Sequence, residues 1–160
     1  MKTQVWAHRG ASAYAPENTL EAFRLAAEMG ADGVELDVQL SRDGELVVAH
    51  DETIDRVSNG TGYIKDYTLA QLKKLSFNRL FLKFKDVRIP TLKEVYELLK
   101  PAGLTVNVEL KTGIILYPEI EEKVLALTAS MGMEDRVIYS SFCHPSLVRL
   151  KELDSGLKTG

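Results

Sequence analysis

The chain has 160 residues, of which 45% are hydrophobic and 27% charged, as is usual for one globular domain. Its formal net charge of -3 argues against a nucleic-acid partner, which requires an excess of Lys and Arg. Cys143 is the only cysteine, and the sequence shows neither a signal-peptide pattern nor the roughly 20 apolar residues of a membrane span. We therefore expect a cytoplasmic protein without stable membrane insertion, or a secreted form whose signal has been removed.

The first part of the chain predicts a strand followed by a helix. Residues 4–7 are mostly apolar and lead into His8 and Arg9, which indicates a buried strand with polar residues at its carboxyl end. Asn18 is then the expected N-cap of a helix, because apolar residues follow it at helical spacing. Gly30 is expected to end this helix.

The next part alternates between apolar and polar side chains. Residues 33–40 have this pattern, so one face of the expected strand is apolar and the other carries carboxylates. The turn signal at residues 42–44 leads to a second apolar run, residues 46–49, which ends at His50. Residues 52–90 are turn-rich and irregular, and we expect an inserted subregion that serves function.

The rest of the chain alternates helix and strand, which predicts an α/β fold with a parallel sheet. The expected elements are a helix from Thr91 that ends at Pro101, a strand over residues 104–110, a helix over 120–129, a strand over 137–142 and a helix over 145–153. Polar residues gather at the carboxyl ends of the strands, as at the active face of a (β/α) barrel. An open doubly wound sheet places its site at the same ends and remains an alternative.

Three carboxylates form a candidate metal site. Glu35 and Asp37 are two positions apart on one strand and therefore project from the same face. Glu109 adds a third oxygen donor from another strand, and such a set suits Ca²⁺ or Mg²⁺. The alternative is a half-exposed strand whose carboxylates are simply solvated.

Two histidines are candidates for proton transfer. His8 and His50 each follow an apolar strand, and imidazoles exchange protons near neutral pH. A single histidine at a strand end is more often structural, but two beside an acidic cluster favour catalysis. Arg9 and Lys111 are candidates for phosphate binding, with structural salt bridges as the alternative. Residues 59–62 are more typical of a surface turn than of a phosphate loop.

Taken in order, these motifs resemble the glycerophosphodiester phosphodiesterase family. The matching segments are HRG at residues 8–10, PENT at 16–19, ELDVQLSRDGELVVAHD at 35–51, DRVSNGTG at 55–62, IPTL at 89–92, VELK at 108–111 and SSF at 140–142. HRG alone is a weak signal, whereas the ordered set is specific and covers nearly the whole chain.

The resemblance implies a (β/α)8 TIM-type barrel with an insertion at about residues 52–90. It implies one divalent cation at Glu35, Asp37 and Glu109, an acid/base pair at His8 and His50, and substrate or phosphate contacts at Arg9, Glu17 and Lys111. The family hydrolyses glycerophosphodiesters to an alcohol and glycerol 3-phosphate, so a small-molecule phosphodiester is the expected substrate.

A complete barrel of this type needs about 250 residues. We therefore expect one incomplete barrel domain over residues 1–160, with about the first half of the barrel and a fifth strand beginning near residue 157. Open sheet edges would favour self-association. Two alternatives remain: a phosphodiesterase for lysophospholipid or sphingolipid head groups, and an inactive fragment that binds metal or phosphate. The first would use an apolar groove, for which Tyr63, Tyr67, Phe77, Phe81 and Phe84 are candidates.

Overall fold

In the computed structural model, which describes residues 3–160, one five-stranded sheet has the order β1-β2-β4-β5, and β3 pairs with β2. The strands are β1 (Trp6–His8), β2 (Gly33–Leu40), β3 (Leu46–Val48), β4 (Thr105–Leu110) and β5 (Val137–Ser140). The helices are α1 (Leu20–Glu28), α2 (Leu69–Leu72), α3 (Leu92–Ala102), α4 (Ile120–Ser130) and α5 (His144–Leu153), with short 3₁₀ turns η1 (Ile64–Asp66) and η2 (Glu134–Arg136). The pairs β1–β2, β2–β4 and β4–β5 are parallel, whereas β3 runs antiparallel to β2.

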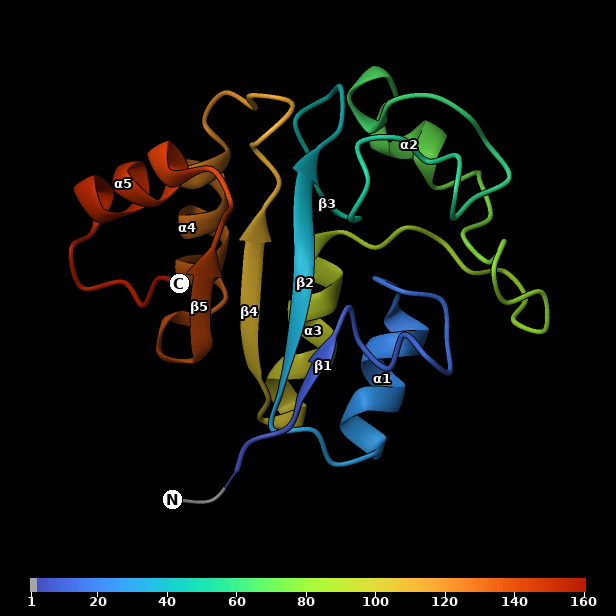
Figure 1. Ribbon diagram of the computed structural model, residues 1–160, viewed down its shortest axis with the longest axis horizontal. Coiled ribbons are helices and arrows are strands. Elements are labelled where there is room, and N and C mark those ends of the chain that lie inside the picture. The colour runs from blue at the N-terminus through green and yellow to red at the C-terminus, as the bar shows by residue number, and fades with distance from the viewer. Residues whose placement is uncertain (1–2) are drawn as a thin grey trace.

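The two faces of the sheet differ sharply in chemistry. Alternate residues of β2 and β4, such as Leu36 and Val108, are buried in one apolar cluster with residues of α1, α3, α4 and α5. Full burial of one such side chain contributes about 1.5–3 kcal/mol, so this face holds the layers together. Figure 1 shows α3 and α4 behind the sheet. The opposite face carries Glu35, Asp37 and Glu109, so the doubly wound alternative, with helices on both faces, is wrong.

The predicted N-cap of α1 is off by one residue. Thr19 caps the helix, because its hydroxyl oxygen accepts a hydrogen bond from the backbone N–H of Ala22 at 3.3 Å. Asn18 instead has a φ of 55° and donates its side-chain amide to Asp37. Gly30 follows the C-cap with a φ of 78°, as expected for a residue that ends a helix.

The predicted end of α3 at Pro101 is also wrong. The helix continues through Ala102, and Gly103 caps it in the left-handed region with a φ of 75°. Proline lacks the backbone N–H but tolerates a helical φ, so it can sit in the last turn. At the start, Thr91 and Glu94 form a capping box.

Residues 52–90 have their own small core. A second apolar cluster contains Ile54, Ile64, Leu72 and Phe77, and Tyr67 and Phe84 are among the side chains packed against it. These three aromatic residues therefore build this core, while Tyr63 is 47% exposed. The sequence pattern missed η1 and α2 here, and the capping box of Thr68 and Gln71 begins α2.

The turn at residues 59–62 is anchored to the same core. The backbone N–H of Asn59 donates to the carbonyl of Ser76, and its side-chain oxygen accepts from the Ser76 N–H at 2.9 Å. A side chain at Gly60 would lie 2.8 Å from atoms of Ile54 and Leu75. This packing favours a structural turn over a phosphate loop.

Strand ends differ modestly from the prediction. β5 ends at Ser140, two residues early, because the Ser141 hydroxyl donates to the Leu110 carbonyl and turns the chain. β1 begins at Trp6, where its pairing with Gly33 starts. Thr159 makes a parallel bridge with Tyr139 of β5, as expected for the start of a fifth parallel strand after β1, β2, β4 and β5. Within residues 3–160, no helix is long and apolar enough to cross a membrane.

Candidate active site

Strand register brings the predicted site residues together. In the β2–β4 pair, Asp37 lies opposite Glu109, and in the β1–β2 pair, His8 lies opposite Glu35. Residues opposite each other in neighbouring strands project from the same face of the sheet. The polar face therefore collects three carboxylates and one imidazole near the carboxyl ends of adjacent strands.

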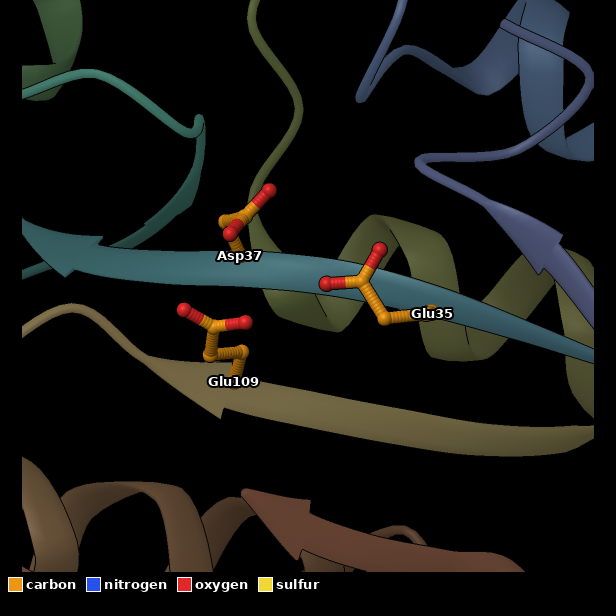
Figure 2. A group of neighbouring side chains, drawn as sticks. All are labelled: Glu35, Asp37 and Glu109. Carbon is orange, nitrogen blue, oxygen red and sulfur yellow. The ribbon is translucent and has the colours of Figure 1, made fainter. Parts of the chain in front are cut away.

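The three carboxylates form one compact group. Glu35, Asp37 and Glu109 each offer an oxygen, and these oxygens all lie within 4.8 Å of one another. Figure 2 shows them gathered over the same side of β2 and β4. The Asp37 side chain is 1% exposed, Glu35 12% and Glu109 15%. The alternative of a solvated, half-exposed strand is therefore wrong.

The electrostatics of this group call for a compensating charge. Burial, together with the neighbouring charges of Asp37 and Glu109, raises the pKa of Glu35 to about 7, although the backbone N–H and the guanidinium of Arg9 act to lower it. Buried Oε1 of Glu35 and buried Oδ1 of Asp37 make no hydrogen bond. Unpaired buried oxygens are costly, and a hard divalent cation binds oxygens of this kind. The donor set therefore fits such a cation.

Two basic side chains flank the carboxylates. Lys111 Nζ lies 3.0 Å from Glu109 Oε1 and 3.6 Å from Asp37 Oδ1. Arg9 Nη1 donates to Glu17 Oε1 at 3.1 Å, while its buried Nε lies 3.6 Å from Asp37 Oδ2 and makes no hydrogen bond. The ion-pair alternative, with Glu35 or Glu109 as the expected partner, describes Lys111, whereas the Arg9 side chain pairs with Glu17 and Asp37 instead. These ion pairs do not prevent Arg9 and Lys111 from binding a phosphate group, because both side chains lie beside the carboxylates.

The two histidines reach this region by different routes. His8 ends β1, its side chain is 69% exposed, and its Nε2 lies 3.7 Å from Glu35 Oε2. His50 returns toward β2 because β3 is antiparallel, and the N–H of Ala49 donates to the carbonyl of Asp37. His50 Nδ1 lies 2.7 Å from Asp51 Oδ1. Both histidines therefore contact a carboxylate.

Two buried amides that support the site were not identified from the sequence. Gln39 donates its side-chain amide to the carbonyls of residues 49, 50 and 51, and accepts from the Tyr117 hydroxyl at 2.8 Å. Asn18 donates to Asp37 Oδ2 at 2.9 Å. Gln39 shares the polar face with Glu35 and Asp37, a spacing that could have revealed it. The positive φ of Asn18 is a signal only the backbone provides.

Arg56 was also missed. Its guanidinium donates to both carboxylate oxygens of Glu17 at 2.8 Å and to Asp51 Oδ2 at 2.7 Å. These hydrogen bonds lower the pKa of Glu17. Burial raises the pKa of Asp51, but the contacts with Arg56 and His50 together lower it below its usual value. Arg56 thus joins residues 52–90 to the loop after β1 and to the segment containing His50.

A separate cavity of about 550 Å³ contains none of the predicted site residues. It lies among Leu46, Thr91, Lys123 and neighbouring residues of α3 and α4. Its Lys73 is already paired with Glu94, whose other contacts cap α3. We therefore place the site at the carboxylates.

A mainly parallel sheet with helices on its apolar face and a buried carboxylate group on its polar face is typical of an α/β barrel protein with its site at the carboxyl ends of the strands. The model of the glycerophosphoryl diester phosphodiesterase family matches residues 8–160. A glycerophosphodiester phosphodiesterase of Caldanaerobacter subterraneus subsp. tengcongensis is 54% identical over 100% of this chain and 66% of its own length. The chain belongs to the glycerophosphoryl diester phosphodiesterase family.

Solved structures agree with this assignment. A glycerophosphodiester phosphodiesterase from Agrobacterium tumefaciens superposes with a TM-score of 0.90 at 36% identity, over 99% of this chain and 66% of that one. A phosphodiesterase of Oleispira antarctica, solved with its product sn-glycerol-3-phosphate, has a TM-score of 0.85 at 35% identity over 99% of this chain and 65% of that one. The chain spans slightly under two thirds of these relatives' lengths. The predicted TIM-type barrel class, with about half of the barrel in the chain, is confirmed.

Proposed function

We propose that this protein hydrolyses glycerophosphodiesters to an alcohol and glycerol 3-phosphate. The observation that carries the proposal is the compact group of Glu35, Asp37 and Glu109, with unpaired buried oxygens, in a chain of this family. The relatives are named for this activity, and one phosphodiesterase was solved with sn-glycerol-3-phosphate. A basic and an imidazole side chain beside the carboxylates suit a phosphodiester rather than a neutral substrate.

In this proposal, Glu35, Asp37 and Glu109 hold one divalent cation, Ca²⁺ or Mg²⁺. Their oxygens are hard ligands, and a bound cation would offset both the burial and the like charges that raise the pKa of Glu35. When bound, the cation neutralises charge that develops on the phosphoryl oxygens. Arg9 and Lys111 add positive charge beside it, and Glu17 holds the Arg9 guanidinium in place.

The proton transfers are assigned to His8 and His50. Hydrolysis forms a bond from the attacking oxygen to phosphorus and breaks the bond to the alcohol oxygen. One imidazole takes the proton of the attacking glycerol hydroxyl, and the other protonates the departing alkoxide. Water then opens the cyclic phosphate that results, which gives glycerol 3-phosphate, with the two proton transfers reversed. The contact between His50 Nδ1 and Asp51 leaves Nε2 of His50 for this exchange, while the largely exposed His8 faces solvent beside Glu35.

A second candidate is cleavage of lysophospholipid head groups at the same site. Exposed apolar side chains favour it: Ile114 and Leu116 follow β4 and are 76% and 80% exposed, and Leu82 in residues 52–90 is 71% exposed. An acyl chain could pack on such side chains. Comparing turnover of glycerophosphocholine with that of lysophosphatidylcholine separates the two substrate classes.

The direct test measures glycerol 3-phosphate release from glycerophosphocholine, with Ca²⁺, with Mg²⁺ and with a chelator. We expect release only with a cation, and its loss in Glu35→Gln. Glu122→Gln is a matched control, because Glu122 pairs with Arg149 on the helical side. Cation binding without release under any condition would favour a binding protein and contradict the proposed hydrolysis.

Two further expectations belong to the same proposal. The single free cysteine suits a reducing compartment, and we place the enzyme in the cytoplasm. Self-association through a sheet edge stays a prediction, which sedimentation velocity at several protein concentrations tests.

A further inference from the structure

Arg56 makes an unusually complete set of ion pairs for a partly exposed side chain. Its Nη1 and Nη2 each donate to one oxygen of Glu17 at 2.8 Å, and its Nε and Nη2 donate to the two oxygens of Asp51 at 2.7 and 3.2 Å. The guanidinium is thus bidentate toward two carboxylates at once. Bidentate geometry fixes the orientation of each partner as well as its distance.

The Asp51 carboxylate that Arg56 holds also contacts His50. Oδ1 of Asp51 lies 2.7 Å from Nδ1 of His50 and 3.2 Å from Nη2 of Arg56. An ionised carboxylate can only accept, so Nδ1 of a neutral His50 carries the proton and Nε2 is the free acceptor. The backbone of this segment is fixed separately, by the Gln39 amide. Arg56 therefore acts on the side chain of Asp51, not on the path of the chain.

An isolated surface ion pair would add little, since exposed pairs are worth 0–1 kcal/mol. Arg56 differs because it joins three parts of the chain: Glu17 before α1, Asp51 after β3, and residues 52–90, to which it belongs. Glu17 also accepts from Arg9, which borders Asp37. Charges linked in this way orient one another more strongly than isolated pairs do.

Resting on the proposed function, we propose that Arg56 is a positioning residue for the reaction. It holds the Asp51 carboxylate against Nδ1 of His50, so that His50 stays in the tautomer with a free Nε2. Residues 52–90 thereby contribute to the proton transfer through Arg56, although they pack in a different apolar cluster from the one between the sheet and its helices.

The first measurement does not depend on turnover. ¹⁵N NMR of the side chains reports the tautomer of each of the three histidines in the neutral imidazole form. We expect His50 to be Nδ1-protonated in the parent, and Arg56→Ala to move it toward the tautomer mixture of an exposed histidine. Arg88→Ala is the control, because Arg88 donates to the carbonyls of Lys74 and Leu75 in the same subregion. It should leave His50 unchanged.

The second measurement is steady-state turnover of glycerophosphocholine. We expect Arg56→Ala to lower kcat by about 10–100-fold, the usual effect of losing a group that orients a ligand or base, with KM and metal affinity nearly unchanged. Arg56→Lys keeps the positive charge but not the bidentate geometry, so its kcat should lie between those of the parent and of Arg56→Ala. Because Arg56 acts through Asp51, the variant with both Asp51→Asn and Arg56→Ala should be no slower than Asp51→Asn alone.

The two measurements separate this inference from the proposed function. A parent-like His50 tautomer in folded Arg56→Ala overturns the positioning role, whatever the turnover. Parent-like kcat in Arg56→Ala also overturns it, provided that His50→Ala is impaired. If Arg56→Ala does not fold, the same comparisons are made with Arg56→Lys, where an unchanged tautomer and kcat count against the role.

Discussion

Two acidic groups lie close together in this protein, and they differ in how fully neighbouring side chains compensate their negative charge. The cation-site group, Glu35, Asp37 and Glu109, leaves two buried oxygens without hydrogen bonds, and the pKa of Glu35 rises to about 7. The clasp group, Glu17 and Asp51, is neutralised by the guanidinium of Arg56, and the pKa of both carboxylates is lowered. Each group contacts one histidine, His8 in the first and His50 in the second.

The two groups differ in how fully the protein compensates their charge: Lys111 and Arg9 lie beside Glu109 and Asp37, but two buried oxygens of the first group still make no hydrogen bond. The clasp group has its counter-charge within the protein, so its function is to hold neighbouring parts in place. The cation-site group sits on paired strands, which cannot move apart to relieve repulsion between its members. In the proposed function, a divalent cation supplies the remaining positive charge. Four predictions test this difference between the two groups and the roles proposed for the site.

The largest expected effect concerns the two histidines. His8→Ala and His50→Ala should each lower turnover of glycerophosphocholine by about 10²–10⁴-fold, because each removes one proton-transfer group. The double variant should lose less than the product of the two, since groups that act together are not additive. Steady-state rates measured with saturating cation give the comparison.

A substrate with an activated phenol as leaving group shows which histidine is the general acid and which is the general base. Such a phenolate needs no protonation, so the variant lacking the general acid should recover on this substrate and the variant lacking the base should not. Near-parent rates of both single variants on glycerophosphocholine would remove the histidines from the chemistry.

Removing one cation ligand should have the next largest effect. Glu35→Gln should weaken divalent-cation binding by more than about 100-fold, because loss of an outer-shell partner alone costs 10–100-fold. In the parent, cation at 100 times Kd should raise the free energy of unfolding by about 2.7 kcal/mol, and this increase should disappear in the variant. Calorimetry and thermal unfolding measure both. Glu17→Gln, from the clasp group, is the control, and equal losses in the two variants would contradict the distinction.

The pH dependence of stability should have opposite signs in the two groups. The pKa of Glu35 rises from 4.5 to about 7 on folding, so the folded chain binds more protons than the unfolded one between these values. Its contribution to the free energy of unfolding therefore falls as pH rises from 4.5 to 7, by about 1–2 kcal/mol after allowance for partial exposure. Glu17 has a lowered pKa, so its contribution is present above 4.5 and is lost as pH falls below it.

Urea unfolding in the presence of a chelator, at a series of pH values, tests both signs. Glu35→Gln should flatten the decline between pH 4.5 and 7, and Glu17→Gln should reduce the loss on the acid side. Unchanged profiles in both variants would mean that neither carboxylate has a shifted pKa.

The smallest effect is expected on substrate selectivity. Residues 52–90 are predicted to control the access of substrates to the site. Shortening residues 59–62 would test this poorly, because Asn59 anchors that turn to Ser76 and its loss would disturb the fold of the subregion. Leu80 and Leu82 are better positions, since they are 57% and 71% exposed. Replacing both with Ser should change the ratio of kcat/KM between head groups by a few-fold, about 1 kcal/mol, and leave cation affinity intact. An unchanged ranking of head groups would remove this role.

Local patterns in the sequence predicted most of the framework. The alternation in β2 identified Glu35 and Asp37 as neighbours on the polar face, because side chains of a strand alternate. The errors occurred where distant contacts decided the local structure. Asparagine is a common N-cap residue, yet the side-chain amide of Asn18 donates to Asp37 and Thr19 caps the helix. Proline commonly ends a helix, yet α3 continues past Pro101 through Ala102 and is capped by Gly103.

The α/β class, the order of the strands and longer helices, and eight candidate site residues were predictable from the sequence, because these follow from period, turn chemistry and motifs along the chain, Glu17 through the family resemblance alone. Which carboxylates of the site have a basic partner within the protein becomes clear only from the folded structure. Arg56 is 39 residues from Glu17 and only five from Asp51, and nothing local distinguishes it from Arg79 or Arg88. Whether a carboxylate is paired, buried or left for a cation depends on strand register and on what packs against it, and those are properties of the folded chain.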